Sequence, residues 1–131
     1  MANAPRLLAV DDMDSVRALV AAIGRACGFD VVQASNGKQA LATCRTAPGG
    51  FAVIVSDWNM PQMNGEEFVR ALREQDKTTP VIILTAERER EKLKELVAIG
   101  INGYILKPFR PEDLHKALSV IANRLGIKAP A

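Results

Sequence analysis

The chain has 131 residues, of which 48% are hydrophobic and 24% are charged, a balance typical of one ordinary globular domain over residues 1–131. Its 17 Lys and Arg against 15 Asp and Glu leave a net charge of only +2 with both signs interspersed, so we expect no nucleic-acid partner. No apolar run approaches the ~20 residues of a membrane span, and residues 1–5 lack a signal-peptide pattern. A cytoplasmic protein without membrane contact is therefore expected.

Short apolar runs predict the strands of a parallel sheet. Four of them are continuously hydrophobic rather than alternating, which is the pattern of strands covered on both faces. They comprise residues 7–10, 51–55, 81–84 and 104–106. A fifth candidate, residues 31–34, is shorter and contains Gln33, which suits a strand at the edge of the sheet.

Apolar residues at helical spacing lie between these runs. One stripe from Val16 to Cys27 ends at Gly28, and another begins at Pro111 and ends before Gly126, so both carry the expected end signals. Weaker stripes cover residues 40–44, 68–72 and 93–97. Five strands alternating with five helices predict an α/β sandwich with right-handed crossovers. We also expect a loop at residues 47–50 and a frayed end at residues 129–131.

Sulfur and imidazole side chains are few. Cys27 and Cys44 fall in helical patterns among apolar neighbours, and we interpret them as reduced packing residues rather than a disulfide or reactive pair. The single histidine, His115, excludes a site built from several histidine ligands and is predicted to lie at the surface.

Polar residues follow the four strong strands. Asp11 and Asp12 come after the first, Asp57 after the third, Thr85 after the fourth and Lys107 after the fifth. Because the carboxyl ends of parallel strands emerge at one edge, where ligands bind, these side chains are expected to converge. A single Asp after a strand more often caps a helix or is solvated; it is the repeated placement that favours a site.

Three neighbouring carboxylates repel one another unless a cation or protons neutralise them. Their hard oxygen donors favour Mg²⁺, and an acidic cluster with Mg²⁺ and a lysine is typical of a phosphate site. The chain lacks the glycine-rich loops that bind nucleotides or dinucleotides. A hydrolytic phosphatase stays open as an alternative, although no spare general acid or base lies at this edge. Ala86 leaves room beside Thr85, and Lys107–Pro108 is a candidate cis peptide bond.

An ordered set of short motifs runs through the chain. These are Asp11-Asp12, Ser56-Asp57-Trp58-Asn59-Met60-Pro61, Met63-x-Gly65, Leu84-Thr85-Ala86 and Tyr104-x-x-Lys107-Pro108-Phe109. Over residues 6–125 the set resembles the receiver domain of two-component response regulators, and within that family the free-standing regulators of chemotaxis. The resemblance implies a flavodoxin-like, doubly wound, five-stranded parallel sheet of strand order 2-1-3-4-5 with five helices.

The resemblance also implies roles for the acidic residues. Asp57 would be the phosphoacceptor, whose carboxylate attacks a phosphohistidine of a histidine kinase. Asp12, Asp57 and the backbone carbonyl of Asn59 would ligate Mg²⁺, with Asp11 acting mostly through a metal-bound water.

The remaining motif residues would act after phosphoryl transfer. Thr85 and Lys107 would bind phosphoryl oxygens, and movement of Thr85 would favour an inward Tyr104. Without the resemblance, Tyr104 is interpreted as a half-buried aromatic with a solvated hydroxyl. Asn59 and Glu87 would influence the phosphoryl lifetime.

The function implied is signalling by protein contact. A monomer that promotes only its own phosphorylation and dephosphorylation would bind a partner, the flagellar motor switch, and a phosphatase is a further candidate partner. Since the receiver occupies nearly the whole chain, output is expected from a surface formed by the fourth helix, fifth strand and fifth helix. Alternatives are a phosphate sink or relay receiver, a slow phosphatase and a flavin binder, which would be yellow.

The charged run from Glu87 to Lys92 has a simpler explanation than a partner site. Opposite charges three residues apart predict an exposed helix stabilised by its own ion pairs. The expected pairs are Glu87–Arg90, Glu89–Lys92 and Glu91–Lys94.

Overall fold

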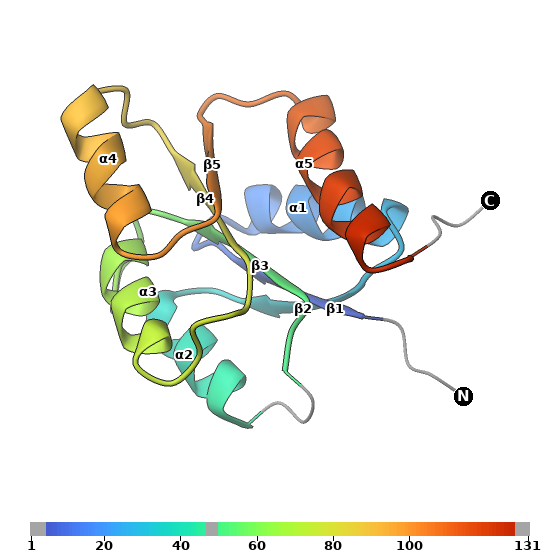
Figure 1. The fold of residues 1–131 in the computed structure, drawn as a ribbon, viewed down its shortest axis with the longest axis horizontal. Helices are drawn as coiled ribbons and strands as arrows, with labels where there is room; N and C mark the ends of the chain where they lie inside the picture. The colour runs from blue at the N-terminus through green and yellow to red at the C-terminus, as the bar shows by residue number, and fades with distance from the viewer. Residues whose placement is uncertain (1–4, 47–49, 128–131) are drawn as a thin grey trace.

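A computed structural model of the chain describes residues 5–46 and 50–127. Five parallel strands alternate with five helices in chain order (Figure 1). The elements are β1 (Arg6–Val10), α1 (Asp14–Ala26), β2 (Asp30–Ala34), α2 (Gly37–Thr46), β3 (Val53–Asp57), α3 (Gly65–Arg73), β4 (Val81–Thr85), α4 (Arg90–Ala98), β5 (Gly103–Leu106) and α5 (Pro111–Arg124). The sheet order is β2-β1-β3-β4-β5, which confirms the predicted doubly wound fold and places β2 at an edge.

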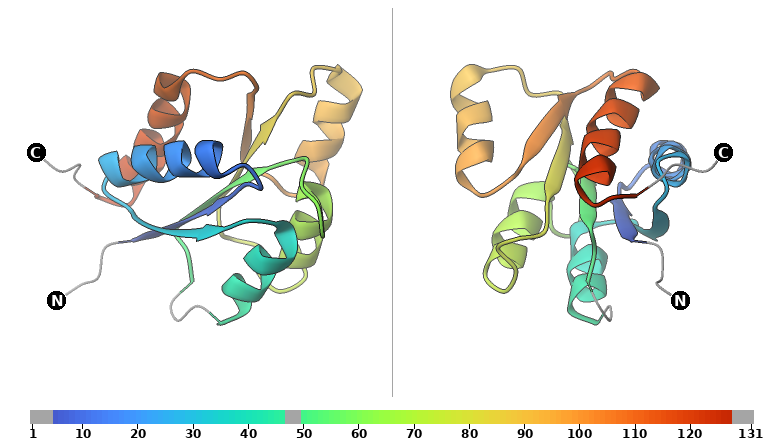
Figure 2. Two further views of the ribbon diagram at one scale, coloured as in Figure 1. Left: turned by 180° about the vertical axis from the view of Figure 1, so that it is seen from behind. Right: turned by 45° about the vertical axis from the view of Figure 1, so that its right-hand side comes forward.

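Helices cover both faces of the sheet. The right-hand view of Figure 2 shows α1 and α5 on one side of the strands and α3 and α4 on the other. Successive residues of β1 pack into opposite layers: Leu7 and Ala9 lie in the core under α1 and α5, whereas Leu8 and Val10 lie in the core under α2, α3 and α4. This is why the strand is hydrophobic at every position.

The helix ends carry the predicted signals. Gly28 and Gly126 follow α1 and α5 with φ of 97° and 73°, a left-handed backbone that glycine adopts without a steric penalty. Pro111 opens α5. Asn64 and Glu67 form a reciprocal capping box at the start of α3, and this box orients the helix that follows the site-bearing β3 strand.

Every strand boundary lies within two residues of its expected position, and the largest shifts include the starts of the third strand and of the fourth helix. The third strand begins at Val53 rather than Phe51, and Phe51 instead lies against the guanidinium of Arg6, whose carbon is 5.0 Å from the ring centre. Helix α4 begins only at Arg90, because the Thr85 hydroxyl accepts a hydrogen bond from the Glu87 amide and so shapes a turn before the helix.

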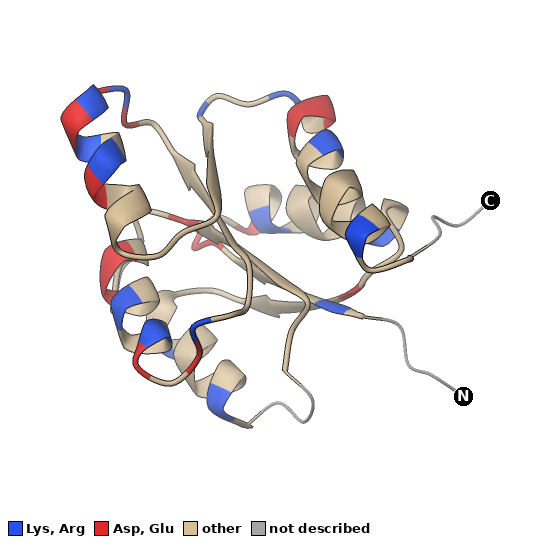
Figure 3. Cartoon of the chain, in the orientation of Figure 1, with Lys and Arg blue, Asp and Glu red and all other residues tan. Residues whose placement is uncertain are grey.

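One of the three predicted ion pairs is wrong, because α4 begins only at Arg90. Glu87 does not pair with Arg90; its Oε2 lies 3.9 Å from Lys92 Nζ. The other two pairs are present at 3.8 and 3.7 Å, and Figure 3 shows residues of both charge signs interspersed along α4. The predicted exposed, self-paired helix is therefore confirmed from Arg90 onward.

The remaining sequence predictions about the fold have separate outcomes. Cys27 and Cys44 are free thiols packed against the two cores, as expected. His115 is exposed. Within residues 5–46 and 50–127, no helix combines the length and apolarity needed to cross a membrane. The predicted frayed end and all of the predicted 47–50 loop except Gly50 lie outside the described residues.

Candidate functional site

The strand ends bring the predicted polar residues to one edge of the sheet. Asp57 and Thr85 are the last residues of β3 and β4, while Asp11 and Lys107 directly follow β1 and β5. Since all of these strands are parallel, their carboxyl ends share an edge.

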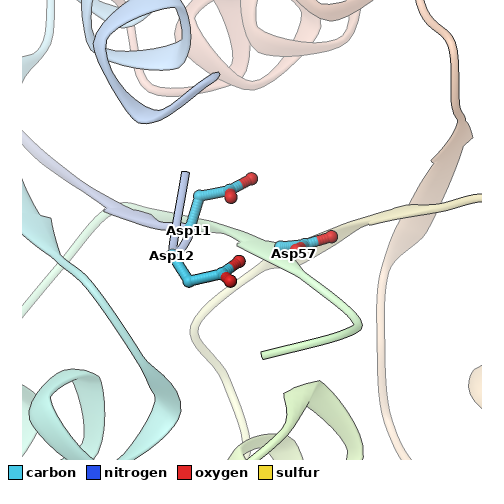
Figure 4. A group of neighbouring side chains, drawn as sticks. All are labelled: Asp11, Asp12 and Asp57. Carbon is cyan, nitrogen blue, oxygen red and sulfur yellow. The ribbon is translucent and has the colours of Figure 1, made fainter. Parts of the chain in front are cut away.

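Asp11, Asp12 and Asp57 form a cluster of carboxylates. Each offers an oxygen within 4.8 Å of the others, and Figure 4 shows the three side chains extending to the same side of the strand ends. Asp11 and Asp57 are buried, whereas Asp12 is exposed to solvent. The cluster therefore has two buried oxygen donors at its base and one at its open side.

Lys107 supplies an internal positive charge to this cluster. Its Nζ donates a hydrogen bond to Asp57 Oδ1 at 2.8 Å and lies 3.8 Å from Asp11 Oδ2. The Lys107–Pro108 peptide bond is cis. One ammonium thus faces two buried carboxylates, which offsets part of their mutual repulsion.

The carboxylate of Asp57 is held at one oxygen. Oδ1 accepts hydrogen bonds from Lys107 and from the Trp58 amide, the latter at 2.9 Å, and the residue is only 5% exposed. Oδ2 accepts none from residues 5–46 or 50–127. One oxygen therefore orients the group while the other keeps its lone pairs for a ligand or an electrophile.

Asp11 carries a buried oxygen without a hydrogen bond. Its Oδ1 accepts from the Met13 amide at 2.9 Å, but Oδ2 is buried and has no hydrogen-bond partner among the described residues. Burial raises the pKa of Asp11, the Met13 amide opposes this, and the nearby Asp57 adds to it. A buried carboxylate oxygen that lacks a hydrogen bond, beside two more carboxylates, is a donor set that suits a hard divalent cation, so these residues fit Mg²⁺.

Asn59 and Glu87 lie beside this edge rather than in the carboxylate cluster. Asn59 is exposed in the loop between β3 and α3, two positions after Asp57. Glu87 is half-buried in the turn before α4, where its Oε1 accepts from the Glu89 amide at 2.9 Å. The roles expected for both residues stay predictions.

Thr85 and Tyr104 connect the cluster to the β5 edge. Thr85 is 1% exposed, and its hydroxyl accepts from the Glu87 amide at 3.0 Å. Tyr104 pairs with Ile83 across the β4–β5 ladder, and its side chain is 39% exposed. The tyrosine therefore faces outward while the Thr85 hydroxyl is bonded within its own turn.

An open groove lies beside Tyr104, between α4 and β5. It has a volume of about 430 Å³, and it combines basic with apolar side chains. Its lining residues are Arg88, Arg90, Leu93, Lys94, Val97 and Tyr104. Arg88 also donates to the Lys107 carbonyl at 3.2 Å, which links the turn before α4 to the loop after β5.

Two residues around the site carry no signal in the sequence. Arg88 belongs to a charged run that self-pairing alone explains, and Arg17 occupies a polar position of an amphipathic helix, where the sequence predicts no contact although the residue is half-buried. Yet Arg17 donates to the Asp11 carbonyl at 2.8 Å. Only the packing of α1 over the end of β1 reveals that contact.

The chain is similar in sequence to known proteins over most of its length. The family model described as the response regulator receiver domain matches residues 7–119. Chemotaxis protein CheY-3 of Vibrio cholerae serotype O1 is 39% identical over 123 residues, which are 92% of this chain and 93% of that protein. Chemotaxis protein CheY of Pseudomonas aeruginosa is 36% identical over 92% of this chain and 98% of its own length.

Solved structures have the same architecture. The chemotaxis response regulator CheY4 of Vibrio cholerae superimposes with a TM-score of 0.83 at 43% identity, covering 91% of this chain and 99% of that one. The receiver domain of the Francisella response regulator 1452 gives a TM-score of 0.83 at 32% identity, covering 92% and 98%.

Proposed function

Because this chain belongs to the response regulator receiver domain family, we propose that it accepts a phosphoryl group on Asp57 from a phosphohistidine of a histidine kinase. The observation that carries the proposal is the pairing of Asp57 with Lys107 inside the cluster formed with Asp11 and Asp12. The protein is then a signalling switch that promotes only its own phosphorylation and dephosphorylation, in the cytoplasm.

The transfer uses the two oxygens of Asp57 differently. Oδ2 attacks phosphorus, the bond between phosphorus and the histidine nitrogen breaks, and the imidazole leaves with that electron pair. Meanwhile Lys107 and the Trp58 amide hold Oδ1, so the attacking oxygen is presented in one orientation.

Asp11, Asp12 and Asp57, with the backbone carbonyl of Asn59, are the residues that would hold Mg²⁺. When bound, the ion withdraws negative charge from the transferring phosphoryl group. The Oδ2 of Asp11 supports this assignment: it is buried and accepts no hydrogen bond from the described residues, and the Lys107 ammonium at 3.8 Å is too distant to donate one, so a bound cation would satisfy it.

The phosphoryl group would change the site through charge. The acyl phosphate carries about two negative charges where the Asp57 carboxylate carried one, and both Lys107 and the Thr85 hydroxyl turn to the phosphoryl oxygens. Thr85 then releases the Glu87 amide that it now binds, and the space it leaves favours an inward Tyr104. Asn59 and Glu87, which flank this edge, influence how long the phosphoryl group persists.

We further propose output through the groove beside Tyr104, with the flagellar motor switch protein as partner. The relatives that are chemotaxis proteins by name support this, as does the change expected at Tyr104. The groove's three basic side chains suit a partner segment that carries acidic residues.

Phosphorylation is tested with acetyl phosphate and Mg²⁺, followed by Trp58 fluorescence and by mass spectrometry. We expect a Mg²⁺-dependent fluorescence change and one added phosphoryl group in the wild type and in a control with the exposed Asp30 replaced, Asp30→Asn, and neither of these in Asp57→Asn. Phosphorylation of the Asp57→Asn variant would show that another residue is the acceptor.

The partner is tested separately with a peptide from the motor switch protein. Tighter binding of the phosphorylated chain, lost in Tyr104→Ala, supports a motor regulator. Phosphorylation without any change in peptide affinity points instead to a phosphate sink or relay.

A further inference from the structure

Arg17 is locked by three hydrogen bonds beside the acidic cluster. Its Nη1 donates to the Asp11 carbonyl at 2.8 Å, its Nη2 to Asp14 Oδ1 at 2.6 Å and its Nε to Gln33 Oε1 at 3.1 Å. The side chain is only 17% exposed. A guanidinium bound on three sides has little rotational freedom left, so the carbonyl that it holds is fixed in place.

That carbonyl belongs to the peptide bond between Asp11 and Asp12. The Asp11 amide donates to the Ala34 carbonyl at 3.2 Å, and Asp11 Oδ1 accepts from the Met13 amide. With Arg17 on the carbonyl, every polar group of Asp11 except Oδ2 is hydrogen-bonded. The peptide plane therefore has one orientation, and it sets the direction in which Asp12 leaves the strand.

Asp12 depends on this peptide because nothing else in the described residues holds its side chain. The carboxylate is exposed and accepts no hydrogen bond from residues 5–46 or 50–127, yet it lies with those of Asp11 and Asp57 (Figure 4). Rotation of the peptide would carry its oxygens away from the other two.

We propose that Arg17 is a positioning residue for the metal site: it holds the Asp11–Asp12 peptide so that the carboxylate of Asp12 faces that of Asp57. The inference rests on the Mg²⁺ site of the proposed function. Arg17 contacts the carbonyl of Asp11, not its carboxylate, so it orients the donors without competing for them.

The positive charge of Arg17 and its contact with the Asp11 carbonyl predict opposite effects on Mg²⁺ affinity when Arg17 is removed. A nearby positive charge repels a metal cation, so loss of the charge alone would tighten Mg²⁺ binding. Loss of the carbonyl contact would weaken it, because donors that are not preorganised lose affinity. Asp14 pairs with Arg17 and offsets much of its charge, so the positional effect is expected to dominate.

The experiment titrates Mg²⁺ into the wild type, Arg17→Ala and Arg17→Lys, followed by Trp58 fluorescence and calorimetry. We expect about tenfold weaker binding in Arg17→Ala, the lower end of the effect of losing an outer-shell partner, and partial recovery in Arg17→Lys. Arg25→Ala is the matched control, since Arg25 is exposed in the last turn of the same helix, and it should bind as the wild type does.

A second measurement separates positioning from damage to the fold. The circular dichroism spectrum and the urea unfolding of Arg17→Ala should resemble those of the wild type, because Arg17 belongs to neither hydrophobic core. Should Arg17→Ala fail to fold, Gln33→Ala keeps the charge, removes only one anchor and should weaken Mg²⁺ binding two- to threefold. Equal or tighter Mg²⁺ binding in the folded variant overturns the inference, whereas absence of Mg²⁺ binding in the wild type overturns the proposed function itself.

Discussion

The carboxylate of Asp57 has two oxygens in different environments. Lys107 and a backbone amide occupy Oδ1, and Oδ2 is free of hydrogen bonds from the described residues. Under the proposed function, the lysine orients the acceptor before transfer and binds a phosphoryl oxygen afterwards. Any cation that reaches Oδ1 can perform the first task, whereas the second depends on a compact ammonium, which is a point charge with three donors.

Replacing Lys107 by arginine should separate these two tasks. We expect Lys107→Arg to be phosphorylated by acetyl phosphate but to lose most of its phosphorylation-dependent peptide binding, because the longer planar guanidinium does not fit the space of the ammonium. Mass spectrometry measures the first property, and peptide affinity measures the second. Normal peptide binding by the phosphorylated variant would contradict the role given to Lys107.

Asp76 stabilises the turn between α3 and β4. Its carboxylate accepts hydrogen bonds from the Thr78 amide at 3.0 Å, from the Thr79 amide at 3.1 Å and from both threonine hydroxyls. Burial alone would raise the pKa of Asp76, but these hydrogen bonds outweigh it and hold the pKa below its ordinary value.

Because the pKa of Asp76 is lowered in the folded state, the free energy of unfolding should fall in acid. The stability that Asp76 contributes is present above the ordinary Asp pKa of about 3.9 and is lost as the pH falls through the lower, folded-state value. Asp76→Asn should cost about 1 kcal/mol of unfolding free energy at pH 7, and this difference from the wild type should shrink in acid. Urea unfolding measures both, with exposed Asp30→Asn as the control.

At the scale of elements, the loop between β3 and α3 is docked on the start of α2. The Gly37 amide donates to the Met63 carbonyl and the Lys38 amide to the Gln62 carbonyl, both at 3.2 Å. Gln62 and Met63 adopt φ of 50° and 86°, a left-handed backbone that non-glycine residues seldom adopt. The docking therefore holds a strained loop, and this loop carries Asn59.

Adding one methyl group to Gly37 should disturb that docking. A Cβ at this position would lie 2.2 Å from the Met63 carbonyl oxygen, so the backbone must move. We expect Gly37→Ala to lose about 1–3 kcal/mol of unfolding free energy and to bind Mg²⁺ more weakly through the displaced Asn59 carbonyl. Gly103→Ala, whose Cβ would meet no atom within 4 Å, is the control for urea unfolding and Mg²⁺ titration.

At the scale of the whole molecule, the acidic cluster joins β1 and β3 near the middle of the sheet. Their strand ends carry two buried carboxylates that repel each other and that Lys107, from the edge strand β5, neutralises only in part. The fold therefore carries an electrostatic cost at its own ligand site, and a bound cation should relieve it.

Mg²⁺ should accordingly stabilise the chain against unfolding. At a concentration one hundred times its Kd, binding to the folded state alone contributes about 2.7 kcal/mol. We expect Mg²⁺ to raise the melting temperature, EDTA to reverse the rise and Asp12→Asn to reduce it, as followed by circular dichroism. An equal rise in Asp12→Asn would place the stabilising ion elsewhere.

The sequence by itself determined the order of the elements and the edge at which the polar residues meet. Runs buried on both faces, alternating with helical stripes, leave a parallel sheet as the simplest arrangement, and parallel strands send all their carboxyl ends to one side. The placement of Asp11, Asp57, Thr85 and Lys107 follows from that rule alone. Their roles and the strand order came from the resemblance of the motifs to a family.

Only the tertiary structure decided which atoms meet. Lys107 reaches Asp57 across 50 residues of sequence, and Arg17 reaches the carbonyl rather than the carboxylate of Asp11. Because of the turn at Thr85, α4 starts later than the sequence predicts, and Glu87 forms an ion pair with Lys92 instead of the predicted Arg90. Such contacts depend on how separate elements pack and which rotamers the packing allows, and no local pattern of hydrophobicity or charge encodes those geometries.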